Sequence, residues 1–201
     1  VYIREAIIDG TLPADSMLSE GDLAEHLGVS RTPGRVALAR LQDEGWIRIY
    51  PKRGALVLGF APDELADLSD ARLVLEISGV TRASPDVRLR LADELAASVA
   101  LQRGGCADDD IARFIDLTLE FHASFLRAGA NQFLMDLGAR LSNRQRQVLF
   151  AQQDALRARS EHIIAEHQQL LDCLGNDDVD GFVRVMRAHV ASTVDDELGP
   201  V

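Results

Sequence analysis

Three histidines in the second half of the chain lie where their ring nitrogens could bind a metal ion. His122, His167 and His189 each recur at helical spacing with large hydrophobic side chains, so each faces the interior of a helical segment. Histidines on separate helices can converge on the axis of a bundle. Neutral imidazoles suit Zn, Ni, Fe or Mn, and an added carboxylate favours the harder ions. The alternative, favoured by spacing alone, is three core or interface histidines satisfied by hydrogen bonds.

The histidines belong to a stretch with purely helical periodicity. Proline and glycine positions divide this stretch, and Gly104-Gly105 with the acidic residues 108–110 predicts a solvated break. The predicted helices are one around Leu65–Leu75, one that begins at Pro85, and Ile111–Arg127, Gln132–Leu149, Ala158–Leu174 and Val179–Val194. We expect an antiparallel helical bundle without strands over residues 61–201.

The first 60 residues have a different organisation. A helical pattern begins at Ser19, Gly28-Val29-Ser30 predicts a tight turn, and a second helix ends near Gly45. Apolar runs at 46–49 and 55–58 predict a two-stranded hairpin, or wing. The sequence therefore predicts a mainly α protein: a winged helix-turn-helix at residues 1–60, followed by an all-helical bundle at 61–201.

Composition limits the function classes. The chain has 201 residues, of which 47% are hydrophobic, and a net charge of −11. Residues 1–60 hold 7 basic and 8 acidic residues, whereas residues 61–201 hold 14 and 24. Such acidity argues against coating of nucleic acid by the whole surface but permits a local DNA-reading face. The two cysteines match no metal or disulfide pattern, and no span or secretion signal is visible, so we expect a cytoplasmic protein without membrane contact.

The start of the second predicted helix has side chains suited to DNA. Arg31 and Arg35 share one helical face, and Ser30 and Thr32 lie where hydroxyl and amide groups can hold a phosphate. In a helix-turn-helix this end of the second helix enters the major groove. The alternative is an ordinary surface helix with solvated arginines.

A longer set of motifs resembles the winged helix-turn-helix of the GntR family of bacterial transcription regulators. The matching residues are Leu18-Ser19-Glu20, Leu23-Ala24-Glu25, Leu27 to Pro33, Arg35, Ala37-Leu38, Arg40-Leu41, Glu44-Gly45 and Arg53-Gly54. The resemblance implies that Arg31 and Arg35 read bases and that Ser30 and Thr32 fix phosphates. It also implies that Arg53 and Gly54 at the wing tip enter the minor groove.

Three positions depart from that pattern. Gly21 replaces an arginine that is usual in the family, and Gly34 and Val36 flank Arg35 where a Val-Arg-Glu run is usual. A glycine inside the recognition helix costs about 1 kcal/mol relative to alanine. We expect weaker DNA binding or a changed sequence preference.

Residues 62–195 resemble the FCD-type effector domain of the FadR branch of the same family. The similar motifs are Arg72 with Glu76, Phe121-His122, Ala128 to Asn131, Glu166-His167 and Met186 to His189. The resemblance implies a divalent metal held by one Asp and three His, beside a small carboxylate whose oxygens meet the metal and an Arg. By position the histidines are His122, His167 and His189, and the Asp position is Thr118.

Thr118 puts the metal in doubt because a hydroxyl is a poor substitute for a carboxylate. Asp116 and Glu120 are rotated about 240° and about 160° from His122, so neither replaces the missing ligand. The resemblance implies that Arg72 binds the carboxylate of the effector. The alternative is that Arg72 forms an ion pair with Glu76, four residues further along the helix.

Asn131 has two possible roles as well. It could contact the effector, or it could cap the helix that starts at Gln132, and capping is the more expected of the two.

These features together predict a homodimeric transcription regulator, more often a repressor than an activator. Two winged helices would bind an inverted repeat in double-stranded DNA, and a small organic acid in the His-lined pocket would control that binding. One alternative is a three-His metal-dependent hydrolase or lyase with an incidental N-terminal domain, which lacks a Glu at helical spacing on the His-bearing faces. Another is a metal-independent binding module that never changes DNA affinity. On the leading interpretation the chain is not an enzyme.

Overall fold

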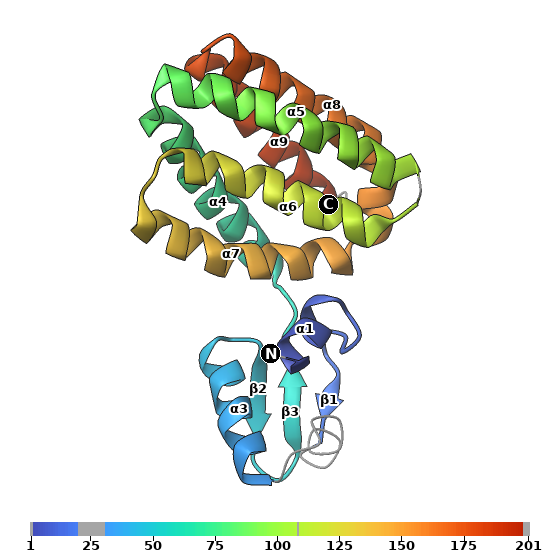
Figure 1. The fold of residues 1–201 in the computed structure, drawn as a ribbon. Helices are drawn as coiled ribbons and strands as arrows, with labels where there is room; N and C mark the ends of the chain where they lie inside the picture. The colour runs from blue at the N-terminus through green and yellow to red at the C-terminus, as the bar shows by residue number, and fades with distance from the viewer. Residues whose placement is uncertain (1, 20–30, 108, 199–201) are drawn as a thin grey trace. The chain divides into compact units, whose positions relative to one another are not determined.

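The chain forms two compact units, Val1–Ala61 and Pro62–Val201, in a computed structural model (Figure 1). The structure describes residues 2–19, 31–107 and 109–198. The predicted fold class, a small unit with helices and a wing followed by a helical unit, is confirmed. The predicted helix that begins at Ser19, together with Ser30, lies almost wholly outside the described residues.

The first unit combines helices with a small antiparallel sheet. Its described elements are α1 (Tyr2–Ile8), β1 (Met17–Leu18), α3 (Arg31–Asp43), β2 (Ile47–Tyr50) and β3 (Gly54–Val57). The strand order is β1-β3-β2, with Leu18 paired to Ala55 and Ile47 paired to Val57. Strands β2 and β3 form the predicted hairpin, and the sheet has one strand, β1, that was not predicted. The missed strand, β1, has only two residues and shows no alternating pattern.

Local backbone chemistry fixes the ends of these elements. Gly45 has φ +76° and ends α3, with its N–H donating to Gln42 O at 2.9 Å and the N–H of Trp46 donating to Leu41 O at 2.8 Å. This pair of bonds is a Schellman motif, which explains the predicted stop. Across the wing tip, the N–H of Arg53 donates to Tyr50 O at 3.0 Å.

Gly54 begins β3 and must be glycine. Its φ is +110°, and a Cβ atom there would overlap the carbonyl oxygen of Leu18 on β1.

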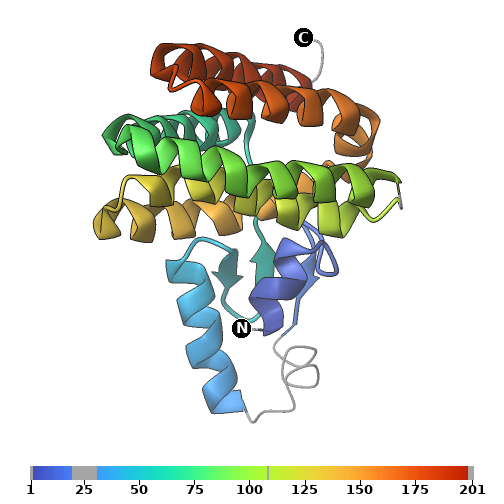
Figure 2. The ribbon, with the colours of Figure 1, turned by 45° about the horizontal axis from the view of Figure 1, so that its top comes forward.

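The described residues of the second unit form long helices. These are α4 (Pro62–Arg82), α5 (Pro85–Ala107), α6 (Ile111–Ala128), α7 (Gln132–Ala151), α8 (Gln153–Gly175) and α9 (Val179–Leu198). α5 packs against α6 and α8, and α4 packs against α6 and α9 (Figure 2). The predicted break is found only at its acidic end, because α5 continues through Gly104-Gly105 to Ala107 and α6 begins at Ile111, after its N-cap Asp110. Helix α8 begins five residues before the predicted Ala158. Among the described residues, no helix combines the length and hydropathy that crossing a bilayer requires.

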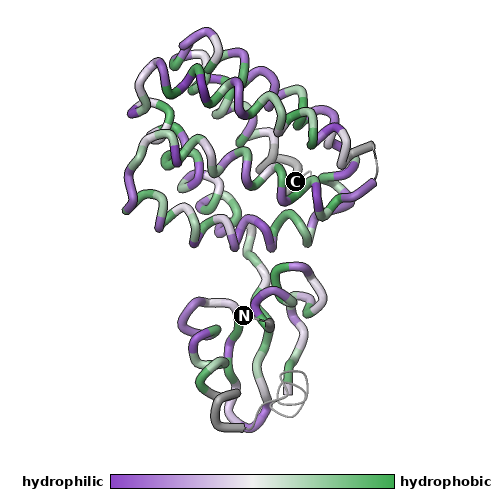
Figure 3. Tube along the Cα trace, in the orientation of Figure 1, coloured by the Kyte–Doolittle hydropathy of each residue, from purple (hydrophilic) through white to green (hydrophobic). Residues whose placement is uncertain are grey.

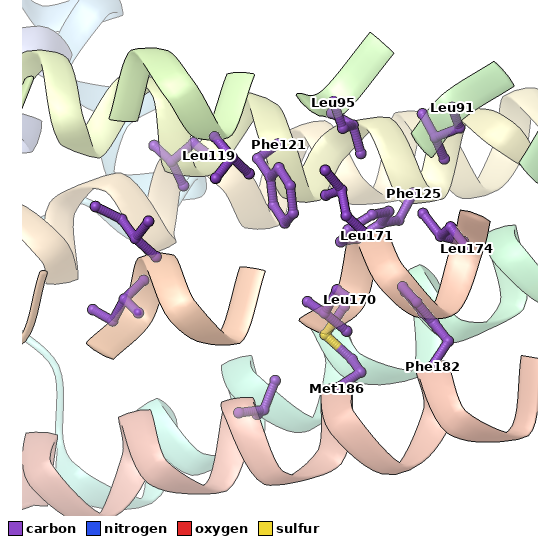
Figure 4. Packing of buried hydrophobic residues seen from close by; sticks show 14 of the residues in the cluster. Leu91, Leu95, Leu119, Phe121, Phe125, Leu170, Leu171, Leu174, Phe182 and Met186 are labelled. Atoms are coloured by element: carbon purple, nitrogen blue, oxygen red, sulfur yellow. The ribbon is translucent and has the colours of Figure 1, made fainter. Parts of the chain in front are cut away.

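The bundle core is built from hydrophobic side chains of six helices, α4 to α9. Hydrophobic and hydrophilic positions alternate along the helices, as the periodicity predicts (Figure 3). Phe121 and Phe125 of α6 lie beside leucines of α5 and α8, and Phe182 and Met186 of α9 belong to the same cluster (Figure 4). The three histidines are embedded in this core.

A glycine contact brings α4 and α6 unusually close. A Cβ atom on Gly79 would overlap the carbonyl oxygen of Phe125, and one on Gly129 would lie 2.8 Å from the Cα of Gly79. The two backbones can touch only because both positions lack a side chain. Glu76 lies one turn before Gly79 on α4, and His122 lies one turn before Phe125 on α6, so the same close approach brings the side chains of Glu76 and His122 into contact.

Candidate metal centre and ligand cavity

The three predicted histidines converge in the core of the second unit. His122 lies on α6, His167 on α8 and His189 on α9, and their side chains are buried. Each offers one ring nitrogen, and these three atoms lie within 4.8 Å of one another. Helical periodicity alone therefore identified side chains that meet in space.

Each imidazole is oriented by an acceptor on its outer nitrogen, Nδ1. The pairs are His122 with Glu76 Oε2 (2.7 Å), His167 with Gln102 Oε1 (2.7 Å) and His189 with Glu166 Oε2 (2.8 Å). An acceptor at Nδ1 assigns the proton to that atom, a tautomer inferred from the hydrogen bonds. The lone pair is then on Nε2, as in metal-binding histidines oriented by a second group.

The Nε2 atoms face one another. Nε2 of His122 and Nε2 of His189 are 3.2 Å apart, and Nε2 of His167 is buried without a hydrogen-bond partner among the described residues. Two nitrogens bound at about 2.0–2.1 Å to one tetrahedral ion are about 3.3–3.4 Å apart. The donor set therefore fits a metal ion such as zinc.

Burial keeps these rings in the form that binds metal. It holds the pKa of His122 and of His167 well below the usual range, and the positive charge of Arg72 adds to the effect. Burial also lowers the pKa of His189, although the hydrogen bond to Glu166 opposes the change. Neutral imidazole is the state required of a metal ligand.

Arg72 lies directly beside the cluster. Its Nε donates to Glu76 Oε1 at 2.7 Å, and one terminal nitrogen lies 3.2 Å from Nε2 of His122. Burial raises the pKa of Glu76, and the Arg72 guanidinium opposes that rise. Arg72 therefore forms the intramolecular pair that the sequence offered as one of its two roles.

The position one turn before His122 carries no charge. Thr118 is 5% exposed, and its hydroxyl oxygen has no hydrogen-bond partner among the described residues. Asp116 and Glu120 lie on the outer side of α6, where they pair with Arg146 (2.9 Å) and Arg127 (2.6 Å). Neither carboxylate therefore reaches the cluster, as expected from their helical rotation relative to His122.

A cavity of about 350 Å³ adjoins the cluster between α4, α6 and α7. Most of its wall is apolar, with side chains such as Leu75, Leu119 and Met135. Its polar wall is formed by Arg72, Glu76, His122, Arg127, Ser142 and Gln145. The cavity thus presents a cation and a potential metal ligand to any molecule inside it.

Asn131 is not among the residues that line this cavity. Its Oδ1 accepts a hydrogen bond from the N–H of Leu134 at 3.2 Å and caps α7. The capping interpretation accounts for Asn131, and its predicted contact with a ligand finds no support in the cavity.

The predicted DNA-reading residues are only partly described. Arg31, Thr32 and Arg35 belong to the first turns of α3, and Ser30 lies outside the described residues. Gly34 is also within α3, so the helix tolerates it, whereas Gly21 lies outside the described residues. Arg53 is exposed at the wing tip, next to Gly54.

Two of the groups that hold the imidazoles come from helices without a histidine and were not predicted from the sequence. Glu76 reaches His122 from α4, and Gln102 reaches His167 from α5, although the His-bearing faces themselves carry no Glu at helical spacing. Periodicity within one helix carries no information about which helix lies beside it. A usable signal was Gly79, because a glycine inside a helix often marks a close backbone approach.

Comparison with known families identifies the class of protein. Residues 1–57 match the bacterial regulatory proteins of the gntR family, and residues 67–192 match the FCD domain. The chain therefore belongs to the GntR family of bacterial regulatory proteins, carries an FCD domain and is a transcriptional regulator.

Several named proteins are similar over most of this chain. An uncharacterized HTH-type transcriptional regulator of Streptomyces ambofaciens is 27% identical, over 96% of this chain and 81% of that protein. The gluconate operon transcriptional repressor of Bacillus licheniformis is 27% identical, over 85% of this chain and 68% of that protein. A GntR transcriptional regulator structure from Rhodococcus sp. RHA1 has a TM-score of 0.82, 22% identity and coverage of 100% of this chain and 95% of that one. That structural likeness supports the fold.

Proposed function

We propose that this regulator binds operator DNA as a homodimer and that a small carboxylate, together with a divalent metal ion, controls its DNA affinity. The observation that carries the proposal is the convergence of three buried Nε2 atoms beside Arg72 and a cavity. A bound divalent ion would supply a positively charged, Lewis-acidic contact for a carboxylate oxygen. His122, His167 and His189 would hold that ion.

Arg72 would position the carboxylate. A guanidinium binds a carboxylate through two parallel hydrogen bonds, and the cavity gives access to this side chain. The apolar remainder of the cavity suits a small acid with a hydrocarbon part. Effector binding then needs to favour one arrangement of the dimer by only about 1–3 kcal/mol.

The DNA-binding role rests on the first unit. Arg31 and Arg35 would contact bases, Ser30 and Thr32 phosphates, and Arg53 with Gly54 the minor groove. Two copies related by a twofold axis would recognise an inverted repeat. Repression is favoured because one similar protein is named as an operon repressor.

Regulation fits this site better than metal-dependent hydrolysis. Glu76 and Glu166, the carboxylates that contact the histidines, bind the outer Nδ1 atoms. There they orient the rings, whereas a general base would have to face the ligand side of the ion.

The proposal can be tested with DNA selected from random duplexes by the wild-type protein. Fluorescence anisotropy would measure its affinity with Zn²⁺ and with acetate, benzoate or succinate. We expect at least one acid to change the dissociation constant about fivefold or more, with a weaker response in Arg72→Lys, which cannot form the two-bond grip. Arg90→Lys on the exposed side of α5 is the control. No response to any acid, or a full response in Arg72→Lys, would contradict the proposal.

A further inference from the structure

We propose that the metal ion and a carboxylate bind this site as a pair, each weakly without the other, because the protein supplies no anionic ligand to the ion. This inference rests on the proposed function and describes how its site is regulated. Occupancy would then report the presence of the acid, since the ion alone would be poorly retained.

The ligand side of the cluster contains no anionic group among the described residues. His122, His167 and His189 each offer one ring nitrogen, and the group of potential ligands that they form contains no carboxylate. Thr118 lies on the same face of α6 as His122, and its buried hydroxyl has no hydrogen-bond partner among the described residues. Thr118 therefore places an unpaired hydroxyl, and no charge, one turn before His122.

The nearby carboxylates are already engaged. Glu76 uses one oxygen for His122 and the other for Arg72. Glu166 places one oxygen on His189, and its other oxygen accepts from the Ser192 hydroxyl at 3.3 Å. A carboxylate that moved to the ion would give up these bonds.

The guanidinium of Arg72 is a permanent positive charge beside the histidine cluster. A terminal nitrogen of Arg72 lies 3.2 Å from Nε2 of His122, the atom that an ion would use. A divalent ion would therefore add two positive charges next to a guanidinium in a buried environment, which is costly without a compensating anion. A carboxylate in the cavity, which Arg72 and His122 both line, would neutralise the ion and the guanidinium together.

The coupling must be reciprocal. If an anion raises the affinity for the ion by some factor, the ion raises the affinity for the anion by the same factor. Zn²⁺ and acetate are suitable probes, because acetate is small enough for the cavity and associates only weakly with free Zn²⁺.

Isothermal titration of the full chain with Zn²⁺ would test the coupling in nitrate buffer and in acetate buffer of equal ionic strength. We expect the Zn²⁺ dissociation constant of the wild-type protein to fall about tenfold or more in acetate. Thr118→Asp places a carboxylate beside the ligands, so it should bind Zn²⁺ about tenfold more tightly in nitrate and show little acetate effect. Thr118→Asn, of similar size but neutral, should behave like the wild type.

Each outcome has a definite meaning. Equal Zn²⁺ affinity of the wild type in both buffers, or equal tightening by Thr118→Asn and Thr118→Asp, would overturn the paired binding while leaving the metal site itself in place. Absence of Zn²⁺ binding in the wild type and in Thr118→Asp would overturn the metal site as well. If Thr118→Asp does not fold, acetate binding by the wild type with and without Zn²⁺ decides the question by reciprocity.

Discussion

The imidazole planes of His122 and His189 are inclined by 15° to each other, and their Nε2 atoms lie 3.2 Å apart. Both outer nitrogens are engaged by glutamates, so both inner lone pairs point into the same space. Two lone pairs at this distance repel unless a proton or a metal ion lies between them. Because burial opposes a charged imidazole, a metal ion is the partner that this arrangement fits best.

Loss of one imidazole should abolish metal binding. Loss of a group that only orients a metal ligand weakens metal binding by about 10–100-fold, so removal of the ligand itself in His167→Ala should weaken Zn²⁺ binding in acetate by at least about 100-fold. Gln169→Ala on the same helix is the control, because that side chain is exposed. Isothermal titration measures both variants, and comparable Zn²⁺ affinity in the two would remove His167 from the site.

The metal-free protein should lose stability as the pH falls below about 6.5, the ordinary histidine value. Below this pH the histidines of the unfolded chain bind protons, whereas the buried rings of the folded protein stay neutral. Each buried ring therefore lowers the free energy of unfolding by about 1.4 kcal/mol per pH unit, until the pH reaches its lowered native pKa. Above about pH 6.5 the histidines are neutral in both the folded and the unfolded chain, so the free energy of unfolding no longer changes with pH on their account.

Urea unfolding with a chelator would measure this pH dependence. The raised pKa of Glu76 acts in the opposite direction, so the comparison is between the wild type and His167→Leu. The variant should lose less stability over the same pH range because it has one buried imidazole fewer. Parallel pH profiles for the two proteins would be inconsistent with a neutral buried His167.

Two glycine substitutions should have opposite effects. Gly79→Ala forces a Cβ atom into the backbone of Phe125 and should lower the free energy of unfolding by about 1–3 kcal/mol. Gly104→Ala meets open space within α5 and should raise it by about 0.5–1 kcal/mol. Thermal or urea unfolding gives both values. Similar stabilities of the two variants would mean that α4 and α6 are not in backbone contact.

Arg35→Ala should weaken binding to the selected DNA by about 1–3 kcal/mol, as expected for an arginine that contacts a base. Arg90→Ala removes the same charge from an exposed position in the second unit and should have little effect. Anisotropy titrations at one salt concentration make the comparison valid. An equal loss in both variants would indicate that Arg35 acts only through net charge.

Sequence reasoning predicted the features that a single helix or turn determines. The 3.6-residue period placed His122, His167 and His189 on buried faces, and Gly45 and Asn131 marked helix ends through their own backbone chemistry. These signals depend only on residues close together in the chain, so a single sequence is enough to recognise them.

The contacts that orient the histidines depend on tertiary packing and could not be predicted in the same way. Glu76 and His122 are separated by 46 residues, and Gln102 and His167 by 65. Which helix lies beside which depends on the whole core. Arg72 illustrates the consequence, because its pair with Glu76 was visible from spacing whereas its contact with His122 was not.

Crystals of the wild-type protein grown with Zn²⁺ and acetate would test the central claim most directly, through anomalous scattering at the zinc absorption edge. We expect one strong peak per chain, about 2.0–2.1 Å from the Nε2 atoms of His122, His167 and His189. An anomalous map without a peak among these ordered side chains, or with zinc only at the surface, would contradict it.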